Sequence, residues 1–406
     1  MGIEAYLRKV VRQGDLEVRL PGGRRVTAGD GSGPPIAVAV ASRLWAARIA
    51  AFPETALGDA YMEGALSFER GDVYDLLALA GRNMPHRRPA HPPSAIRRWM
   101  HDVRSTRNAR RAANLNARHH YDVPLEVYRR FLDADLQYSC AYFDHPDMTL
   151  EEAQVAKQRR IAAKLLLAPD QRVLDIGCGW GGLARRLALE AGVRVDGVTL
   201  SPAQLAEAQA RAEAMRLSPR VRYSLTDYRD AVGPYDRIVS VGMFEHVGRP
   251  NYRTYFEKVR RLLTDDGVAL IHAIGRFDGP GVTQPWIARH IFPGGYIPAL
   301  SETLAAVERA GLIVTDVEIL RLHYAETLAA WRRRFLASRD EIRALAGERF
   351  CRMWEFYLAA SEVGFRYAGH MVFQLQLARR IDAAPLTRDY IGEGARHLAE
   401  HRAIAA

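Results

Sequence analysis

The stretch Val173-Leu174-Asp175-Ile176-Gly177-Cys178-Gly179-Trp180-Gly181-Gly182 decides the fold of this chain. It predicts a buried strand that ends in a glycine-rich turn and continues into a helix over residues 183–190. Small residues in such a turn let the backbone approach a ligand, and the start of the helix offers free N–H groups and the positive end of its dipole. The alternative interpretation is a tight turn without a ligand, because a bare Gly-x-Gly pattern is a weak signal.

Around this turn, strands alternate with helices, which predicts an α/β domain with a mostly parallel sheet. The further predicted strands cover residues 193–199, 221–225, 236–241, 267–274, 313–320 and 371–377. The predicted helices cover residues 125–132, 149–167, 202–215 and 252–263, a segment from residue 302, and long stretches between 327 and 365.

Residues 1–81 predict a separate small α+β domain. Leu16–Leu20 and Arg24–Thr27 alternate around Pro21-Gly22-Gly23, which indicates a hairpin, and Ile36–Val40 predicts another strand. Ser42 is a plausible cap for a helix that runs to residue 52. No catalytic constellation is visible here, so this segment alone would indicate a structural or docking domain.

Residues 82–116 predict a basic, proline- and arginine-rich linker. Between residues 82 and 118 there are ten arginines and one acidic residue, Asp102. Its segment Ile96-Arg97-Arg98-Trp99-Met100 mixes basic and large apolar side chains, as in segments that lie on an anionic bilayer. A solvated, charged tether is the alternative. At the other end of the chain, residues 384–406 predict a short surface helix and tail.

The composition is that of a globular protein with excess positive charge. The 406 residues carry 57 Lys and Arg against 47 Asp and Glu, a net charge of +10, and all but four of the basic residues are arginine. This excess suggests an anionic partner, such as a membrane surface, nucleic acid or an acidic substrate, or it reflects genome composition. The three cysteines lack metal-ligand or disulfide spacing and fit a reducing cytoplasm. Arg43 and Arg48 interrupt the apolar stretch 36–52, so any membrane contact is predicted to be peripheral.

The turn could hold a dinucleotide or S-adenosylmethionine. Gly177, Gly179 and Gly182 fit Gly-x-Gly-x-x-Gly, but the second strand ends without the acid that would hold a dinucleotide ribose. Asp175 precedes the turn instead, and Asp227 ends the third strand. This arrangement resembles S-adenosylmethionine-dependent methyltransferases, in which the third-strand acid meets the adenine amine.

Five further motifs narrow this resemblance. They occur in order around the glycine turn: Tyr138-Ser139-Cys140-Ala141-Tyr142-Phe143, Gly197-Val198-Thr199-Leu200-Ser201, Gly242-Met243-Phe244-Glu245-His246-Val247-Gly248, His272-Ala273-Ile274-Gly275 and Ile291-Phe292-Pro293-Gly294-Gly295. Over residues 117–380 the chain resembles the cyclopropane-fatty-acyl-phospholipid synthase family, which is related to the mycolic acid cyclopropane synthases. Leu57-Gly58-Asp59-Ala60-Tyr61-Met62-Glu63-Gly64 is similar to the N-terminal domain of the bacterial phospholipid enzymes.

The resemblance implies a class I S-adenosylmethionine-dependent methyltransferase, with a Rossmann-like mixed sheet over residues 117–383 and a lipid- or membrane-docking domain over 1–81. It implies a cytoplasmic homodimer, peripherally associated with the inner face of the membrane. The implied reaction transfers the methyl group to a cis double bond of a phospholipid acyl chain. Loss of a proton from the new methyl group to a bound bicarbonate then closes a cyclopropane ring.

The family's bicarbonate residues fall on five positions: Cys140, Glu245, His272, Ile274 and Tyr324. Glu245, His272 and Tyr324 would act through their side chains, and Cys140 and Ile274 through backbone N–H groups. Without the family context, Glu245 could cap a helix, His272 could be a satisfied core histidine, and Cys140 could be a small buried apolar residue.

The resemblance also implies the cofactor residues: Tyr138, Ser139, Asp175, Gly177, Cys178, Gly179, Gly181, Thr199, Leu200, Ser201, Gln204, Asp227 and Tyr228. Thr199 and Gln204 would replace the missing ribose acid by neutral hydrogen bonds. Four aromatic residues are candidates either for the wall of an acyl channel or for core packing: Phe244, Trp286, Phe292 and Tyr296.

One position departs from the family pattern: Ser361 stands where many members have cysteine. Methylation of an alkene needs no thiol nucleophile, so we expect activity to persist. The nearest rival function is a lipid C-methyltransferase that gives methyl- or methylene-branched chains. Two other classes are a nucleic-acid methyltransferase, for which the chain lacks the usual catalytic motifs, and a non-catalytic lipid-binding protein.

Overall fold

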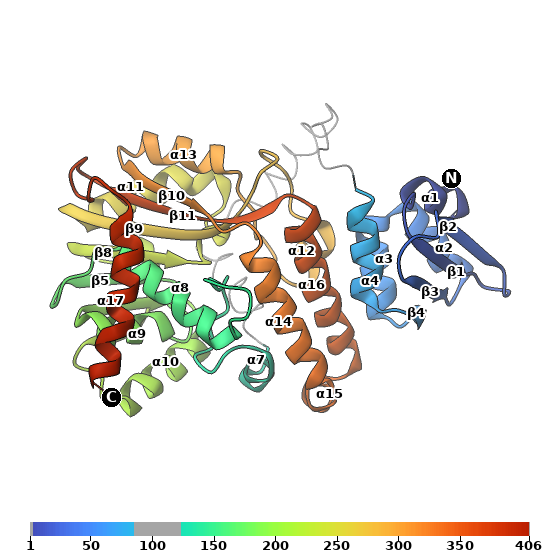
Figure 1. The fold of residues 1–406 in the computed structure, drawn as a ribbon, viewed down its shortest axis with the longest axis horizontal. Helices are drawn as coiled ribbons and strands as arrows, with labels where there is room; N and C mark the ends of the chain where they lie inside the picture. Colours follow the sequence, from blue (N-terminus) through green and yellow to red (C-terminus); the bar gives the residue numbers. More distant parts are fainter. Residues whose placement is uncertain (1–2, 85–122, 406) are drawn as a thin grey trace.

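The computed structural model describes residues 3–84 and 123–405. Its N-terminal unit is a four-stranded sheet, in the order β2-β1-β3-β4, with four helices (Figure 1). The strands are β1 (Asp15–Arg19), β2 (Arg25–Gly29), β3 (Pro35–Val40) and β4 (Leu66–Arg70), and the helices are α1 (Ile3–Val10), α2 (Arg43–Ala51), α3 (Pro53–Met62) and α4 (Val73–Arg82).

The hairpin predicted from residues 16–27 is confirmed. β1 and β2 pair antiparallel with Leu16 opposite Ala28 and Val18 opposite Val26, and all four side chains are buried on one face. β3 then pairs parallel to β1. The Ser42 side chain accepts a hydrogen bond from the Trp45 N–H and begins α2, as predicted. The predicted linker, 82–116, lies almost wholly in 85–122, outside the described residues.

The second unit contains a seven-stranded sheet in the order β10-β11-β9-β8-β5-β6-β7. Its strands are β5 (Arg172–Ile176), β6 (Arg194–Thr199), β7 (Val221–Leu225), β8 (Tyr235–Val241), β9 (Leu263–Arg276), β10 (Ile313–Ile319) and β11 (His370–Ala378). Strands β7, β6, β5, β8 and β9 are parallel, whereas β11 is antiparallel to both β9 and β10. The predicted mostly parallel sheet is therefore confirmed. Strand order reverses between β5 and β8, which is where such sheets bind ligands.

Helices cover both faces of this sheet (Figure 1). They are α7 (Leu125–Phe131), α8 (Leu150–Lys164), α9 (Gly182–Ala191), α10 (Pro202–Ala214), α11 (Tyr252–Leu262), α12 (Pro285–His290), α13 (Leu300–Arg309), α14 (His323–Ala337), α15 (Arg339–Ala346), α16 (Glu348–Tyr367) and α17 (Asp389–Ala405), with short 3₁₀ turns η1 (Tyr228–Asp230), η2 (Phe244–His246) and η3 (Arg249–Asn251). Val173 in β5 packs with α9 and α10, whereas Leu174 and Ile176 pack with α11 and α13. A strand buried on both faces needs the continuous apolar run seen in the sequence.

The N-terminal unit packs on α16 through α3 and α4. The hydroxyl of Tyr61 donates to Glu355, and His290 Nε2 lies 3.1 Å from Asp59 Oδ1. Gly58 lies directly under the Trp286 ring, where an added Cβ would be 2.6 Å from the indole nitrogen. The interface is thus closely fitted as well as polar.

The C-terminal segment is more ordered than predicted. Instead of a short helix and tail, residues 389–405 form the 17-residue helix α17, which packs against α8 and α9. Ile391 is buried and Leu398 packs on the α9–α10 cluster. Burial of these apolar residues stabilises the packed helix. Their place near the end of the sequence did not indicate this.

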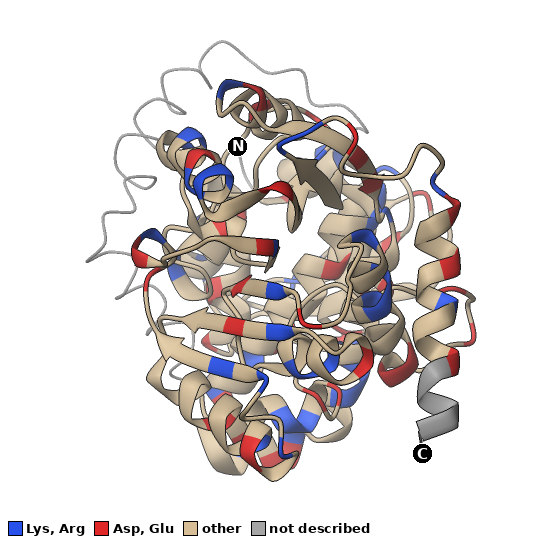
Figure 2. Ribbon diagram, turned by 90° about the vertical axis from the view of Figure 1, so that its left-hand side faces the viewer, with Lys and Arg blue, Asp and Glu red and all other residues tan. Residues whose placement is uncertain are grey.

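Basic and acidic residues are interspersed over the elements in Figure 2. Several arginines there and elsewhere pair with acids, as in Arg334 with Glu151 at 2.6 Å and Arg159 with Glu190 at 3.0 Å. Much of the positive charge in the described residues is therefore compensated locally. Within residues 3–84 and 123–405, no helix has both the length and the apolar character needed to cross a membrane.

Candidate active site

The glycine turn forms the floor of the site. Gly177, Gly179 and Gly181 all have positive φ angles, +81°, +55° and +76°, which favour glycine. At Gly177 an added Cβ would be 2.9 Å from the Met243 Cβ, whereas at Gly179 it would meet nothing within 4 Å. Gly179 therefore faces open space, and the backbone there can lie against a ligand.

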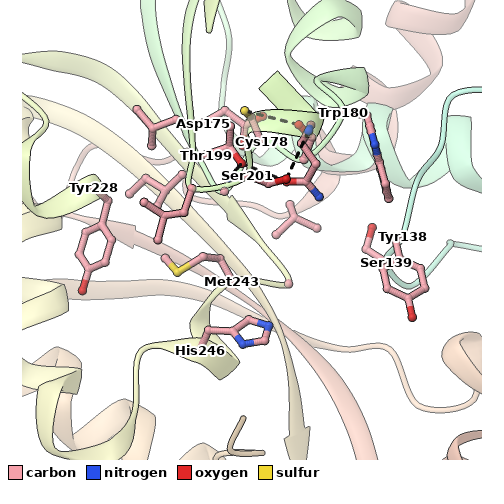
Figure 3. A pocket seen from close by; sticks show the side chains of 18 of the residues that line it. Tyr138, Ser139, Asp175, Cys178, Trp180, Thr199, Ser201, Tyr228, Met243 and His246 are labelled. Carbon is pink, nitrogen blue, oxygen red and sulfur yellow. Dashed lines mark hydrogen bonds between the residues drawn. The ribbon is translucent and has the colours of Figure 1, made fainter. Parts of the chain in front are cut away.

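A cavity of about 190 Å³ opens above this turn, at the carboxyl ends of β5, β6, β7 and β8. In Figure 3, Tyr138 and Ser139 lie on one side of the space and Tyr228 on the other, with Met243 and His246 between them. The residues predicted to bind the cofactor that line it are Tyr138, Ser139, Asp175, Gly177, Cys178, Gly179, Thr199, Leu200, Ser201, Gln204, Asp227 and Tyr228.

Gly181 differs from this prediction, because it does not line the cavity and Gly182 does. An added Cβ at Gly181 would be 2.4 Å from the Tyr223 hydroxyl, which also donates to the Gly181 carbonyl at 2.8 Å. A glycine at position 181 lets the backbone enter α9 next to the Tyr223 ring. Its role is therefore to shape the turn.

The end of β6 presents neutral hydrogen-bonding groups. The Thr199 hydroxyl donates to Gln204 Oε1 at 3.0 Å and accepts from the Ser201 N–H at 3.2 Å. The Ser201 side chain caps α10 by accepting from the Gln204 N–H. Because all three are buried, this network holds polar atoms at the place where a dinucleotide enzyme would carry an acid.

Asp227 follows β7 and is paired with a residue that the sequence argument missed. Arg229 donates to both carboxylate oxygens, with its Nε 2.8 Å from Oδ1. This pair fixes the direction of Asp227, and both residues line the cavity.

Asp175 fits the polar end of a cofactor. It lies at the end of β5, and burial raises its pKa to about 7, which the positive charge of Lys157 opposes. Within the described residues, its Oδ2 atom is buried without a hydrogen-bond partner. A buried carboxylate oxygen of this kind calls for a donor, and the amino group of S-adenosylmethionine would supply one.

The predicted base residues Glu245, His272 and Ile274 meet at the junction of β8, β9 and β11. The Ile274 N–H donates to Glu245 Oε1 at 2.6 Å, and His272 lies two residues earlier on β9, so both point to the same face. The prediction that Ile274 offers its N–H to an anion is not what this structure shows, because the buried carboxylate already takes that donor.

Glu245 and His272 are both buried, with opposite consequences. Burial raises the pKa of Glu245 to about 7 and lowers that of His272 to about 3. Glu245 Oε2 has no hydrogen-bond partner among the described residues. Gln374, directly opposite on β11, donates from Nε2 to His272 Nδ1 at 3.1 Å. His272 is thereby held neutral with its proton on Nε2.

Cys140 and Tyr324, the other two predicted base residues, are both buried. Both belong to one apolar cluster against which Ile274 packs. The backbone N–H of Ala141 donates to Thr327 Oγ1 at 3.0 Å, which ties this segment to α14, the helix that carries Tyr324. Burial raises the pKa of the Cys140 thiol, so the thiol is not a nucleophile at neutral pH.

The four aromatic residues predicted either to line an acyl channel or to pack in the core differ in burial. Trp286, Phe244 and Tyr296 are fully or almost fully buried, and Phe244 stacks on Tyr252 with ring centres 4.4 Å apart. Core packing therefore describes these three. Phe292 is only partly buried, and its ring lies 6.1 Å from that of His246, a cavity residue.

Several cavity residues were missed although they lie within the quoted motifs: Met243, His246 and Gly294. Their neighbours in sequence could have indicated them. Burial lowers the pKa of His246 to about 4, so it is neutral at pH 7. Lys157 and Gln374 contact the site residues from α8 and from β11, where no motif marked them.

Known proteins share this sequence and geometry. The family model described as mycolic acid cyclopropane synthetase matches residues 108–375. Cyclopropane-fatty-acyl-phospholipid synthase of Escherichia coli K12 is 39% identical over 326 residues, which is 80% of this chain and 83% of that protein. Tuberculostearic acid methyltransferase UfaA1 of Mycobacterium tuberculosis is 39% identical over 285 residues, 67% of this chain and 66% of that one.

The structure of mycolic acid cyclopropane synthase CmaA1 complexed with SAH and CTAB is similar to this fold. It has a TM-score of 0.62 and 34% identity, and the match covers 65% of this chain and 97% of that chain. The class I methyltransferase fold predicted from the glycine turn is confirmed by this similarity.

Proposed function

The chain belongs to the mycolic acid cyclopropane synthetase family, as the motifs predicted, and from that premise we propose that it cyclopropanates unsaturated phospholipid acyl chains. It is an S-adenosylmethionine-dependent lipid methyltransferase of the cyclopropane synthase type. The specific proposal is transfer of a methyl group to a cis double bond, followed by ring closure with bicarbonate as the base.

The chemistry defines what the residues must do. Bound S-adenosylmethionine supplies an electrophilic methyl group, and bound bicarbonate supplies the base. The alkene would use its π electrons to form the new C–C bond while the bond from that methyl group to sulfur breaks and S-adenosylhomocysteine leaves, so that a carbocation forms on the neighbouring carbon. Loss of a proton from the new methyl group then gives the electron pair that closes the ring. The protein must hold the alkene against the methyl donor and exclude water.

The single observation that carries the proposal is the Glu245 carboxylate. One of its oxygens accepts the Ile274 N–H, and the other is buried and, among the described residues, lacks a partner. A buried carboxylate that needs a donor suits the hydroxyl of bicarbonate. Neutral His272 would donate a hydrogen bond from its Nε2–H to a bicarbonate oxygen, and Tyr324 would add one from its hydroxyl.

The decisive experiment uses purified protein, S-adenosylmethionine and vesicles of an oleoyl phospholipid, with fatty-acid products read by mass. We expect a gain of one CH₂ unit, ring protons in the NMR spectrum, and a rate that falls in carbon dioxide-depleted buffer and returns with added bicarbonate. No mass gain would reject the proposed function, and a gain that ignores bicarbonate would reject the proposed base.

A second candidate outcome is a branched chain. UfaA1 is named for tuberculostearic acid, and its similarity to this chain equals that of the E. coli synthase over a shorter stretch. If a hydride shift precedes proton loss, the product is a methylene-branched chain, and a separate hydride donor with a proton would be needed to reduce it to a methyl-branched chain. The same NMR spectrum separates ring protons from methylene or branched-methyl protons.

We also propose that the N-terminal unit makes the peripheral membrane contact. Leu44 on α2 and Phe52 at its end are both 68% exposed, and Arg43 and Arg48 are exposed beside them. The Arg48 guanidinium lies 4.3 Å from the centre of the Trp45 ring. Large apolar side chains next to arginines suit the boundary between acyl chains and phosphate head groups.

The test of membrane contact is co-flotation with anionic phospholipid vesicles. The double variant Leu44→Ser/Phe52→Ser should lose most of the bound fraction, while Leu386→Ser, at a fully exposed leucine in the C-terminal part of the chain, should keep it. Equal binding by both variants would reject this surface. The homodimer and the location at the inner face of the membrane are carried by the family resemblance, and ultracentrifugation and cell fractionation test them.

A further inference from the structure

Lys157 is a buried lysine that the mechanism above does not use. It lies in the middle of α8 and is 0% exposed. Its Nζ atom donates to Gln137 Oε1 at 2.6 Å and to Ser139 Oγ at 2.9 Å. Both partners line the cofactor cavity, and Ser139 precedes Cys140 of the predicted base site. The ammonium therefore lies behind the wall that joins the two halves of the site.

The wall itself is held by the same helix. Residues 133–140 form neither helix nor strand, so their positions depend on side-chain contacts. Gln154 donates from Nε2 to the Ser139 carbonyl at 2.9 Å, and Gln158 donates to Asp135 Oδ2 at 3.0 Å. Three side chains of α8 thus hold this segment, but only Lys157 brings a charge.

A buried charge costs folding free energy unless something compensates it. The atoms that accept hydrogen bonds from Lys157 are uncharged, and the nearby Asp135 is itself paired with Arg185 at 2.7 Å. Burial lowers the pKa of Lys157 to about 8, while Asp133 and Asp135 oppose that change. The side chain therefore remains a cation at neutral pH without an ion-pair partner in direct contact among the described residues.

The positive charge of Lys157 affects pKa values in both the cofactor half and the proposed base half. It opposes the effect of burial on the pKa of Asp175 and on that of the Cys140 thiol, and it adds to the effect of burial on His272. The positive potential favours the anionic forms of Asp175 and Cys140 and disfavours the cationic form of His272. Since Ser139 Oγ accepts from Lys157, the hydroxyl proton of Ser139 is directed to another acceptor.

We propose that Lys157 is a positioning residue that makes the base site selective for an anion, by orienting the Ser139 hydroxyl and supplying a positive charge behind it that no ion pair in direct contact neutralises. This inference rests on the proposed function, in which that anion is bicarbonate. It also separates the two small molecules of the site. Bicarbonate carries a net negative charge, whereas the amino-acid end of S-adenosylhomocysteine is a zwitterion, so removal of one charge should affect bicarbonate far more.

The experiment compares Lys157→Met with Gln154→Met in the full-length protein. Both variants remove a hydrogen bond from α8 to the same wall, but only the first removes a charge. The readouts are the apparent KM for bicarbonate in carbon dioxide-depleted buffer, with oleoyl phospholipid vesicles, and the Kd of S-adenosylhomocysteine by calorimetry. We expect Lys157→Met to raise the KM about tenfold or more. The Kd should rise by a clearly smaller factor, since Lys157 acts on the cofactor half only by favouring the charged form of Asp175. Gln154→Met should change both constants by similar factors.

A parallel loss of both constants in Lys157→Met would mean that the lysine only holds the wall, and would overturn the inference, as would an unchanged KM. If Lys157→Met does not fold, Lys157→Arg decides: a retained charge should keep the KM within about threefold of the wild type, and a larger rise with unchanged Kd would overturn the inference. Failure of the proposed function looks different, because the wild type itself would then show no ring product or no response to bicarbonate.

Discussion

The two halves of the active site are built in different ways. The cofactor half comes from the turns after three neighbouring strands, β5, β6 and β7, which lie within about fifty residues of sequence. The proposed base half comprises Cys140, Glu245, His272 and Tyr324, which come from a loop, the 3₁₀ turn η2, the inner strand β9 and helix α14. Local motifs can therefore specify the first half, whereas the second half forms only when folding brings distant elements together.

The polar atoms of the two halves also differ in where their hydrogen-bond partners come from. In the cofactor half, Thr199, Ser201 and Gln204 bond to one another at the mouth of the cavity. In the proposed base half, Glu245 and His272 each have a partner from a different element, Ile274 and Gln374. Substitutions should therefore impair cofactor binding and proton removal separately.

The largest separation is expected for Glu245→Gln. Loss of the carboxylate should reduce ring formation about 100-fold, in the range usual for removal of a group that serves proton transfer. The Kd of S-adenosylhomocysteine should change little, because Glu245 does not line the cofactor cavity. The measurements are product formation with oleoyl phospholipid and calorimetry. Equal loss of both would contradict the division into two halves.

The reverse separation is expected for Asp175→Asn. Removing the buried charge should weaken S-adenosylhomocysteine binding about tenfold, the effect of losing one charge-assisted hydrogen bond. The KM for bicarbonate should remain close to that of the wild type. Calorimetry and bicarbonate titration measure the two constants. An unchanged Kd would show that the partnerless Oδ2 atom is not a cofactor contact.

A smaller effect is expected in the pH dependence of stability. Burial raises the pKa of Glu245 to about 7 from 4.5, so the folded chain keeps a proton that the unfolded chain releases. The contribution of this group to stability is present below pH 4.5 and is lost as the pH rises through about 7. Relative to the wild type, Glu245→Gln should gain on the order of 1 kcal/mol per pH unit in that window.

Urea denaturation of both proteins across the window measures this difference. The control is Glu257→Gln, at a partly exposed glutamate on α11 that pairs with Arg253 at 2.8 Å. Its difference from the wild type should stay nearly constant. A Glu245→Gln curve parallel to that of the wild type would show that the carboxyl is already ionised in the folded chain.

The smallest effect is expected for Ser361→Cys, which restores the residue of many relatives. Ser361 lies on α16, outside the residues that line the cofactor cavity. Ring formation should stay within about twofold of the wild type, since alkene methylation uses no thiol nucleophile. A large gain in activity would show that the family cysteine has a chemical role.

Much of the fold followed from local pattern. The run before Gly177, the helix after it and the alternation from residue 193 to 274 predicted β5, α9 and the parallel strands with small errors at the ends. The docking of α17 was not predicted, because a few apolar residues such as Ile391 become informative only beside the surface that they cover. Gly181 was assigned to the ligand although its glycine is required by Tyr223.

The sequence by itself determined the cofactor class and the reaction family, because the glycine turn, Asp175 and Asp227 act through local backbone geometry and chemistry. Only the tertiary structure decided that the Ile274 N–H belongs to Glu245, that Gln374 sets the proton of His272, and that Lys157 lies behind Ser139. These are contacts between residues far apart in sequence. The energies of these contacts depend on burial and on side-chain orientation. Neither can be read from the spacing of residues in the sequence.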